Sequence, residues 1–517
     1  MKAPVHSDAA TSHDAMARAG LALAELAPHV DGVIRGDGAV RVLDVEQDSR
    51  RIGQGALFVA LHGARADGVV FAPVAVRQGA SAVMSELGRG EELAALGVPV
   101  LEVRDPRKAM AMVAARVHGH PTRALRVVGI TGTNGKTTIA HLVEAALAAS
   151  GATPGIVGTL GHRLGGRRLG EGHTSPEADE LQRLARTMRD AGASHLVMEV
   201  SSIALASERV AEVAFDVAAF TNLTQDHLDF HGSMAAYAAA KDRLFLDHRP
   251  RVSVVNVDCP HGVSLARRLR ETGSEVLSVS VRSDVGADLA PVEVDSSVEG
   301  TRLTFVDGRV LTSPLVGVHN ASNLLVALGV AQSLGLGRRA EEGIAGMRTV
   351  AGRLERCDEP GLDDVVAVVD YAHTPDALER VLASVRALTK GKLWCVFGCG
   401  GDRDPGKRAP MGEAVARAAD VLVVTNDNPR SEAPEAIAAQ IVQGVQRGGA
   451  ESRHVVVLDR ALAIEHAIAA AAPGDVVLVA GKGHEPYQVL GARTLAFDDR
   501  DEVRAALRRR RALRGDG

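Results

Sequence analysis

A short glycine-rich segment holds the residues whose types and spacing are best suited to bind phosphate. Between positions 126 and 138 the chain reads RVVGITGTNGKTT, an apolar run followed by two close glycines, a lysine and two threonines. Backbone N–H groups in such a turn and the Lys136 ammonium attract phosphate oxygens, and the Thr137 hydroxyl can bind a magnesium ion. The segment therefore predicts a binding loop for a nucleoside triphosphate, made of Gly132, Thr133, Asn134, Gly135, Lys136, Thr137 and Thr138.

The loop is a shorter form of the common motif G-x-x-x-x-G-K-[ST], because Ile130 stands where the first glycine of that motif falls. Its flanks support the interpretation. An apolar run precedes the loop, and Ile139, Leu142, Val143 and Leu147 follow it at helical spacing. A strand, a turn and a helix are therefore expected in succession, so that a helix N-terminus can face the bound phosphate.

Two further strand ends carry groups that could complete a metal site. Glu199 closes the apolar run 196–200, and His227 follows the apolar run 217–220. Because the carboxyl ends of parallel strands meet at one edge of a sheet, we expect both side chains beside the phosphate loop. We predict that Thr137, Glu199 and His227 hold magnesium next to the triphosphate.

Alternating strand and helix patterns along the 517 residues predict an α/β protein of three domains. The expected division is a first domain over 1–122, a central domain over 123–348 and a C-terminal domain over 349–517. We predict a P-loop ATPase-like parallel sheet in the central domain and a Rossmann-like C-terminal domain. Strands are expected at 56–60, 81–84, 98–103, 196–200, 217–220, 252–256, 365–370, 393–398, 421–425, 455–458 and 476–480, a helix at 72–78 and a hairpin turn at 306–309.

The composition excludes several classes of protein. A net charge of −5 argues against a general nucleic-acid binder, which usually presents a strongly basic face. The segment 1–27 carries Asp8, Asp14 and Glu25, and no apolar run reaches the ~18 residues of a membrane span, so neither a signal peptide nor membrane insertion is expected. We expect a cytoplasmic protein with a solvated basic helix at 504–514. The cysteines are too few and scattered for a disulfide framework and are expected as reduced thiols: Cys259, Cys357, Cys395 and Cys399.

Short motifs follow one another in order along almost the whole chain. They are DSR at 48–50, LFVA at 57–60, GTNGKT at 132–137, EVSS at 199–202, NLTQDHLD at 222–229, AK at 240–241, HN at 319–320, GRLE at 352–355, DYAHTPD at 370–376, FGCGGDRD at 397–404, DNPR at 427–430 and GKGHE at 481–485. With these motifs the chain resembles the Mur ligases, the ATP-dependent enzymes that add amino acids to peptidoglycan precursors. One motif alone would be weak evidence, but so many in one order are specific.

The resemblance implies a reaction in which ATP phosphorylates a substrate carboxylate. An amine then attacks the acyl phosphate through a tetrahedral intermediate, and phosphate leaves. The resemblance implies catalytic roles for Lys136, Lys241 and His227, together with two magnesium ions that offset the crowded negative charge. Lys241 matches a lysine that carries a carbamate derived from CO2, and this anion would support a magnesium ion alongside Thr137, Glu199 and His227.

The resemblance also implies the substrates, UDP-N-acetylmuramoyl-L-alanyl-D-glutamate and an amino acid. Ser49 and Arg50 match the uridine end of the first substrate site. The residues that match its muramoyl-peptide part are Thr174, Ser175, Ser201 and Arg209. The residues expected to contact ATP in addition to the phosphate loop are Asn320, Asn323, Arg353, Asp370 and His373. The C-terminal domain is expected to close over the site and to exclude water from the acyl phosphate.

The motif DNPR at 427–430 indicates meso-2,6-diaminopimelate as the amino acid, because within the family this motif marks the diaminopimelate-adding branch. The planar guanidinium of Arg430 suits the distal carboxylate, and Asp427, Asn428 and Glu485 can meet the distal ammonium. Lysine lacks that carboxylate and would leave Arg430 without a partner. The same site is expected to include Arg408 and Gly481.

The chain departs from the family pattern at the peptide site. Ile203 stands where a histidine usually follows EVSS, Ser207 replaces a glutamine near Arg209, and the usual pair of threonines reads Thr174-Ser175. These changes bear on contacts to the muramoyl peptide and leave the positions for metal, lysine and specificity intact.

Other functions remain open at the level of sequence. The chain could be a related ligase that adds lysine or a D-alanyl-D-alanine unit, although the arginine motif argues against both. Folate polyglutamylation is disfavoured by the uridine-type first domain. A binding protein that switches conformation with ATP would leave Lys241 and the motifs of the C-terminal domain without a role. We expect a monomer.

Overall fold

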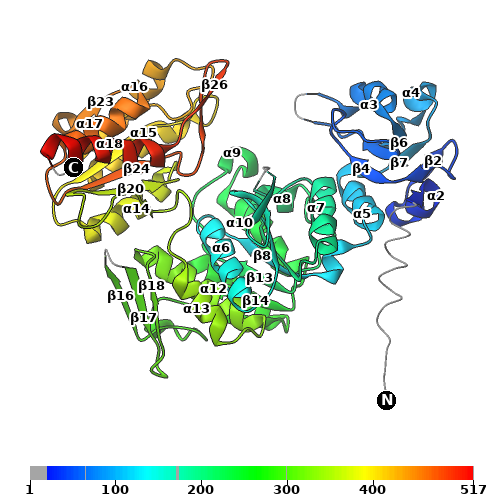
Figure 1. Cartoon of the computed structure of the whole chain (residues 1–517). Coiled ribbons are helices and arrows are strands. Elements are labelled where there is room, and N and C mark those ends of the chain that lie inside the picture. Colours follow the sequence, from blue (N-terminus) through cyan, green and yellow to red (C-terminus); the bar gives the residue numbers. More distant parts are fainter. Residues whose placement is uncertain (1–19, 64–65, 171–173, 298–299, 516–517) are drawn as a thin grey trace.

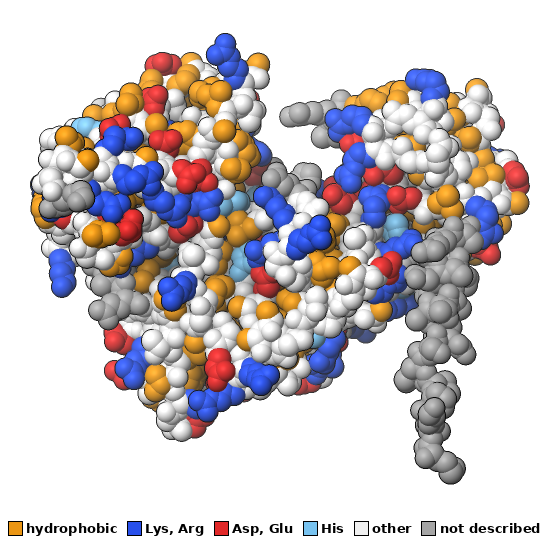
Figure 2. Space-filling view, viewed as in Figure 1, with side chains coloured by type: hydrophobic (Ala, Val, Ile, Leu, Met, Phe, Trp, Pro, Cys, Tyr) orange, Lys and Arg blue, Asp and Glu red, His pale blue; other side chains and the backbone are white. Residues whose placement is uncertain are grey.

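The computed structural model describes residues 20–63, 66–170, 174–297 and 300–515. Asp8 and Asp14, used above to exclude a signal peptide, lie outside the described residues. Figure 1 shows three lobes in an open arc, with a central lobe between an N-terminal and a C-terminal lobe. The space-filling view in Figure 2 shows a broad hollow above the central lobe, between the other two. Each lobe is built on its own β-sheet, and the α/β fold class is confirmed. The domain boundaries near 122 and 348 stay predictions.

The N-terminal lobe has a five-stranded sheet in the order β2-β7-β6-β5-β4, in which only the pair β2–β7 is antiparallel. Apolar residues cover both faces of this sheet, since β5 is buried along its whole length. The strands are β2 (Val33–Arg35), β4 (Asp44–Glu46), β5 (Ala56–Val59), β6 (Ala80–Glu86) and β7 (Val100–Val103), and the longer helices are α3 (Ala72–Gln78) and α5 (Pro106–Val117).

The central lobe is organised around β8 (Arg126–Thr131), which is paired on both sides by parallel strands. Its eight-stranded sheet has the order β11-β10-β9-β12-β8-β13-β14-β15, and only β10 is reversed, running antiparallel to its two neighbours β9 and β11. The other strands are β9 (Pro154–Gly158), β10 (Gly161–Leu164), β11 (Arg167–Gly170), β12 (His195–Glu199), β13 (Val217–Phe220), β14 (Val252–Asn256) and β15 (Glu275–Val279). The predicted strands 217–220 and 252–256 are confirmed with their bounds.

Two apolar cores hold helices to the two faces of this sheet. One core joins it to α6, α12, α13 and a small sheet of β16, β17 and β18, and the other joins it to α7, α10 and α11. The helices are α6 (Lys136–Ala149), α7 (Ala178–Asp190), α8 (Ser202–Ala206), α9 (Leu228–His231), α10 (Met234–Leu246), α11 (Pro260–Glu271), α12 (Val318–Ser333) and α13 (Arg338–Gly346). The strands β16 (Glu293–Ser297), β17 (Gly300–Thr304) and β18 (Val310–Ser313) include the hairpin predicted at 306–309.

The C-terminal lobe is a sheet of six strands in the order β19-β20-β24-β21-β22-β23, parallel except for the short edge strand β19. Helices α14, α15 and α16 pack on one face, and α17 and α18 on the other. The strands are β19 (Glu355–Arg356), β20 (Val366–Asp370), β21 (Leu393–Phe397), β22 (Val421–Val424), β23 (His454–Val456) and β24 (Val476–Ala480), followed by the hairpin β25 (Tyr487–Leu490) and β26 (Arg493–Ala496). The helices are α14 (Pro375–Leu388), α15 (Arg408–Ala418), α16 (Pro434–Arg447), α17 (Arg460–Ala470) and α18 (Asp499–Arg514).

The basic tail forms the predicted helix, α18, and one face of it is solvated while the other is buried. Val503, Ala506 and Leu507 are buried in the apolar core beneath it. Arg504 pairs with Glu355 and Arg510 with Asp364 on the same lobe. The positive charges of this helix are therefore largely met by acidic side chains of its own lobe. Among the described residues, no helix is long and apolar enough to cross a membrane.

A fully buried ion pair ties α17 to α18. The side chains of Arg460 and Asp499 are 0% exposed and lie 2.7 Å apart. Arg460 also donates to the carbonyl oxygens of Asn426 and Ala480, at the ends of β22 and β24. One guanidinium thus fixes both loops that leave the carboxyl edge of this sheet.

We predict that Asp499→Asn lowers the free energy of unfolding of this lobe by about 3–5 kcal/mol, because it leaves the buried guanidinium without its counter-charge. Arg509→Gln is the matched control, since Arg509 and Glu465 are 49% and 43% exposed and such a pair is worth less than about 1 kcal/mol. Fluorescence of the single tryptophan, Trp394 on β21, reports urea unfolding of the lobe. Equal effects of the two substitutions would contradict the prediction.

Candidate functional site: the phosphate loop and its surroundings

The predicted loop joins β8 to α6 as expected, and two lysines converge on one of its carbonyl groups. The carbonyl oxygen of Gly132 accepts hydrogen bonds from Lys136 Nζ at 2.9 Å and from Lys241 Nζ at 2.8 Å. Lys136 also donates to the carbonyl oxygen of Thr133. The backbone of Gly132 has φ +145°, and a Cβ there would lie 1.8 Å from Thr221 Oγ1. Glycine is therefore required at this position.

Lys241 is buried on α10, with only 1% of its surface exposed. Its Nζ lies 4.4 Å from the ring centre of Tyr237, one turn earlier in the same helix. The Tyr237 hydroxyl is 3.1 Å from Thr133 Oγ1, so α10 contacts the loop through two side chains. No carboxylate forms an ion pair with Lys241 in the described part of the chain. A lysine held in this way suits a neutral or modified amine better than a solvated ammonium.

The pKa values of the two lysines at the loop are lowered by burial and by neighbouring positive charge. Desolvation lowers the pKa of Lys136, and Arg353 adds to the shift, while Glu199 and Asp226 oppose it. Desolvation also lowers the pKa of Lys241 well below its usual value, and Lys136 adds to that shift. The site therefore holds cationic groups without enough negative charge of its own, which favours a bound anion.

His227 follows the end of β13, as predicted, and lies beside both lysines. Burial lowers its pKa; Asp226 opposes that effect, and Lys136 and Lys241 add to it. Its backbone has φ +52°, a left-handed conformation that non-glycine residues seldom adopt. Such a conformation is often found at functional sites.

Glu199 and Thr137 supply oxygen atoms at the carboxyl edge of the sheet. Thr137 Oγ1 donates to Glu199 Oε2 at 2.9 Å, and Thr159 contacts the same carboxylate through its backbone N–H and its hydroxyl. No group of three His, Cys, Asp or Glu side chains within the described ranges could hold a metal by itself. Magnesium usually takes only one or two protein oxygens and completes its shell with phosphates and water.

The C-terminal lobe reaches the loop with two side chains. Arg353 Nη2 lies 3.3 Å from Thr137 Oγ1, and the guanidinium stacks 4.6 Å from the ring centre of Tyr371. Asp376, at the start of α14, accepts hydrogen bonds from Asn134 Nδ2 and Thr224 Oγ1. The two lobes therefore meet directly at the phosphate loop.

The remaining residues predicted to contact ATP lie around this junction. Asp370 accepts from the backbone N–H groups of Leu354 and Ala372, so it positions the backbone beside Arg353. His373 interacts electrostatically with Asp226 on the central lobe. On α12, Asn323 donates to Asn320 Oδ1 at 2.9 Å. A Cβ on Gly135 would lie 2.4 Å from Asn323 Oδ1, so this asparagine lies against the loop.

The four residues predicted for the muramoyl peptide come together beside Glu199. Ser175 Oγ donates to the Glu199 carbonyl oxygen at 2.9 Å and accepts from the backbone N–H of Ser201. Thr174 Oγ1 is 3.0 Å from Thr159 Oγ1, and Arg209 donates to the Ser175 carbonyl oxygen. The cluster therefore lies next to the Glu199 carboxylate, which is predicted to bind the metal.

Ser49 and Arg50 are not part of that cluster. They lie in a turn of the N-terminal lobe, where Arg50 is exposed and paired with Asp48 at 2.7 Å. The turn docks on α7 because the backbone N–H of Gln47 donates to Asp179. Burial raises the pKa of the nearby Glu46 carboxyl to about 7, and the Asp179 carboxylate adds to this shift. The Glu46 and Asp179 carboxyl groups, one from each lobe, therefore lie close enough to interact where the two lobes meet.

The predicted amino-acid site forms a second cluster, at the carboxyl edge of the C-terminal sheet. Asn428 Nδ2 donates to Glu485 Oε2 at 3.0 Å, and a Cβ on Gly481 would lie 3.3 Å from Asp427 Oδ2. Arg430 has φ +54° and donates to the carbonyl oxygen of Gly401 at 2.7 Å. Glu485, Arg430 and Asp427 all interact electrostatically with the Tyr487 side chain, and this mixture of charges suits a ligand that carries both signs.

Arg408 stands apart from this set. Its side chain is 1% exposed and holds Glu432 through two hydrogen bonds of 2.8 and 3.0 Å, with a third to Gln440 Oε1. Glu432 Oε1 in turn accepts from the backbone N–H of Asp402. The structure therefore places Arg408 in the support of the loop 400–404, where its guanidinium is already paired.

Comparison with known proteins decides the family. Three family models match in order: the Mur ligase family catalytic domain over 44–118, the Mur ligase middle domain over 130–331 and the Mur ligase glutamate ligase domain over 352–483. The chain is 44% identical over 494 residues to a Streptomyces coelicolor protein, covering 94% of this chain and 96% of the relative. The chain belongs to the Mur ligase family.

The Streptomyces coelicolor relative is named UDP-N-acetylmuramoyl-L-alanyl-D-glutamate--2,6-diaminopimelate ligase. A Gloeobacter violaceus protein of the same name is 44% identical over 506 residues, which are 97% of this chain and 98% of that protein. A solved structure of a ligase with this name has a TM-score of 0.66 at 32% identity and covers 95% of this Mur ligase and 99% of its own chain. MurF from Acinetobacter baumannii shares the fold, with a TM-score of 0.63 at 18% identity. This Mur ligase is thus an ATP-dependent enzyme that forms amide bonds.

Some residues of the Mur ligase site could not be singled out from sequence. Asp376 follows a proline at a helix start, where an acidic residue is ordinary, and only the fold shows that it contacts Asn134. Thr159 precedes β10 without any local signal. Lys482, inside the motif GKGHE, is fully buried among the residues predicted for the amino acid. The sequence analysis selected Gly481 and Glu485 from this motif, but not Lys482.

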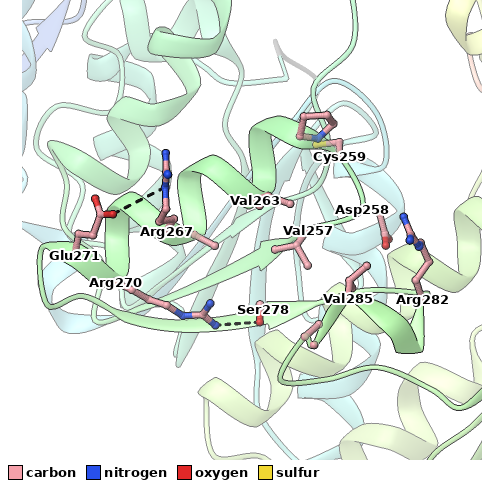
Figure 3. A pocket seen from close by; sticks show the side chains of 14 residues that line it. Val257, Asp258, Cys259, Val263, Arg267, Arg270, Glu271, Ser278, Arg282 and Val285 are labelled. Atoms are coloured by element: carbon pink, nitrogen blue, oxygen red, sulfur yellow. Dashed lines mark hydrogen bonds and ion pairs between the residues drawn. The ribbon is translucent and has the colours of Figure 1, made fainter.

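One pocket beside the sheet does not belong to this site. It measures about 700 Å³ and lies between α11 and the segment after β15 (Figure 3). Its arginines are already paired, since Arg270 contacts Ser278 and Asp288, and Arg282 contacts Asp284. The chemistry of this Mur ligase is therefore expected at the lobe junction, where charged groups remain incompletely paired.

We predict that Gly132→Ala lowers ATP-dependent turnover by about 100-fold or more, because its Cβ would displace Thr221 and shift the phosphate loop by the order of 1 Å. Gly151→Ala is a matched control, as Gly151 also has a positive φ but no atom lies within 4 Å of its Cβ. Phosphate release and nucleotide binding by calorimetry measure the effect. Unchanged ATP binding and turnover in Gly132→Ala would contradict the assignment of the loop.

Proposed function

We propose that this Mur ligase joins meso-2,6-diaminopimelate to UDP-N-acetylmuramoyl-L-alanyl-D-glutamate, with ATP, in cytoplasmic peptidoglycan precursor synthesis. The observation that carries the proposal is the cluster of Arg430 with Asp427, Asn428 and Glu485. It offers a cation and two carboxylates to the distal end of the amino acid, which in diaminopimelate is a zwitterion. The names of relatives that span nearly the whole chain support the same substrates.

The chemistry follows from the groups at the lobe junction. The γ-phosphoryl group of ATP passes to the side-chain carboxylate of the D-glutamyl residue, and the attacking amine then displaces phosphate through a tetrahedral intermediate. Lys136 and Arg353 are placed to offset the negative charge on the transferring phosphoryl group, one from each lobe. Because these two cations come from different lobes, full charge stabilisation requires that the lobes stay together during the reaction.

Magnesium would be held by Thr137, Glu199 and His227, with Lys241 as a carbamate. When bound, the metal would supply positive charge that offsets the negative charge developing on the reacting phosphate and acyl groups. Glu199 is oriented for this role by Thr159, which contacts its carboxylate twice. The hydroxyl of Thr137 lies between that carboxylate and Arg353.

Carbamylation of Lys241 is supported by the surroundings of its amine. The group is buried, lies beside a second lysine and has no paired carboxylate among the described residues. Attack of the neutral amine on CO2 forms the N–C bond and releases one proton, so the position changes from a potential cation to an anion. That change would reverse the sign of the charge that faces the metal.

The other substrate groups complete the proposal. Ser49 and Arg50 would meet the uridine end in the N-terminal lobe, and the peptide would run along the cluster of Thr174, Ser175, Ser201 and Arg209. ATP would also contact Asn320, Asn323, Asp370 and His373, while Arg408 and Gly481 would support or line the amino-acid site. We keep the domains as 1–122, 123–348 and 349–517, and the active species as a monomer.

The decisive experiment measures phosphate release with UDP-N-acetylmuramoyl-L-alanyl-D-glutamate, ATP, magnesium and bicarbonate, comparing meso-diaminopimelate with L-lysine. We expect turnover with diaminopimelate and a product mass that includes it. Arg430→Met is expected to raise the KM for diaminopimelate by about tenfold or more, because a buried carboxylate contact to arginine is lost. Turnover with lysine or D-alanyl-D-alanine instead would overturn the assignment of the amino acid.

A further inference from the structure

Lys482 occupies the middle of the proposed amino-acid site, although no substrate contact is assigned to it. Its side chain is 0% exposed. Its Nζ lies 3.2 Å from Asn428 Oδ1, 3.3 Å from Glu485 Oε2 and 3.7 Å from Asp427 Oδ1. These three residues are the ones proposed for the distal ammonium of the substrate. A positive charge of the protein therefore already lies among them.

The charges of this cluster can be counted. Asp427 and Glu485 contribute two negative charges, and Lys482 and Arg430 contribute two positive charges, so the four groups sum to zero. The neighbouring Arg460 does not alter the sum, since Asp499 pairs with it. Arg403, which also interacts with Tyr487, is exposed and screened by solvent. The cluster as a whole is thus neutral.

One carboxylate oxygen in the cluster is still available to a ligand. Asp427 Oδ1 is buried and accepts no hydrogen bond within the described structure, since Lys482 is beyond hydrogen-bond distance. The other two acceptor oxygens around Lys482 already accept hydrogen bonds from elsewhere. Asn428 Oδ1 accepts one from the backbone N–H of Val489, and Glu485 Oε2 accepts one from Asn428 Nδ2. A second ammonium can therefore be received at Asp427 without displacing Lys482.

We propose that Lys482 is a specificity-determining residue that makes the site neutral and thereby selects an amino acid whose distal end is a zwitterion. This inference rests on the proposed function. The distal end of diaminopimelate carries one ammonium and one carboxylate, so the occupied site stays neutral. The distal end of L-lysine carries an ammonium alone and would leave one uncompensated positive charge in a buried cluster, which is costly.

The proposal differs from the role of Arg430. Arg430 offers a direct partner to the distal carboxylate, whereas Lys482 acts on the balance of charge through Asp427 and Glu485. Loss of Arg430 removes a contact to diaminopimelate. Loss of Lys482 gives the cluster one excess negative charge, which favours a lone ammonium. Arg430 and Lys482 therefore disfavour free L-lysine as a substrate in separate ways.

The test is the ratio of kcat/KM for meso-diaminopimelate to kcat/KM for L-lysine. We expect Lys482→Met to lower this ratio by about tenfold or more, mainly through the two KM values, because close charge pairs at binding sites contribute over 1.4 kcal/mol, the equivalent of tenfold. The double variant Lys482→Met with Glu485→Gln restores neutrality, and its ratio is expected to return toward that of the unchanged enzyme. Lys392→Met, an exposed lysine of the same lobe, is the control and should leave the ratio unchanged.

A loss of activity that is equal for both amino acids in Lys482→Met would overturn the proposal, as would a double variant whose ratio does not recover. Trp394 fluorescence and ADP binding establish that each variant is folded. If Lys482→Met does not fold, Glu485→Gln alone decides, because removal of one negative charge leaves the cluster with a net positive charge, which should raise the ratio, and a fall would contradict the account. Failure of the proposed function is recognised separately, since the unchanged enzyme would then not use diaminopimelate.

Discussion

Two lysine ammonium groups converge on the carbonyl oxygen of Gly132, and most of the site is arranged around that concentration of positive charge. Arg353 adds a third cation from the C-terminal lobe at Thr137. Glu199 and Asp226 oppose the lowering of the Lys136 pKa, and Asp370 interacts with Arg353. A site of this kind is electrostatically incomplete without anionic ligands, and the triphosphate and a carbamate on Lys241 are the anions that the proposal supplies.

The unbalanced positive charge at the phosphate loop explains why the central and C-terminal lobes must meet there. Asp376 holds the loop through Asn134, and Arg353 contacts the first turn of α6. Phosphoryl transfer needs the cations in place, while amide formation needs the amino-acid cluster on the C-terminal sheet. Because Arg460 fixes the loops after β22 and β24 to one buried pair, that cluster moves with the C-terminal lobe as a unit. Substrate selection and phosphate chemistry are therefore brought together by one lobe.

Much of the fold could be predicted from sequence, because buried parallel strands are short apolar runs with polar ends. The runs 217–220 and 252–256 became β13 and β14 with unchanged bounds. The strand expected at 455–458 lies at 454–456 instead, since β23 is an edge strand with a weak apolar pattern. The ion pairs of the basic tail could not be foreseen, because its acidic partners, such as Glu355 and Asp364, lie about 150 positions earlier.

The site was predictable only where a motif fixes local geometry. The turn 132–138 needs its glycines, and the sequence displays them. Arg408 and Lys482 show the limit, because the sequence around a positive residue near a glycine-rich turn does not show which groups it will pair with. Arg408 is occupied by Glu432, and Lys482 is enclosed by Asp427, Asn428 and Glu485. Both contacts depend on pairing between elements that are distant in sequence.

The most direct test of the account asks whether the excess positive charge at Gly132 is met by a carbamate. The measurement is carbon NMR of the enzyme with ¹³C-labelled bicarbonate, magnesium and ADP, with Lys241→Met as the matched control. The account predicts a protein-bound carbamate signal in the unchanged enzyme that is absent in Lys241→Met, together with loss of turnover in that variant. An unchanged enzyme that turns over normally without such a signal would contradict it.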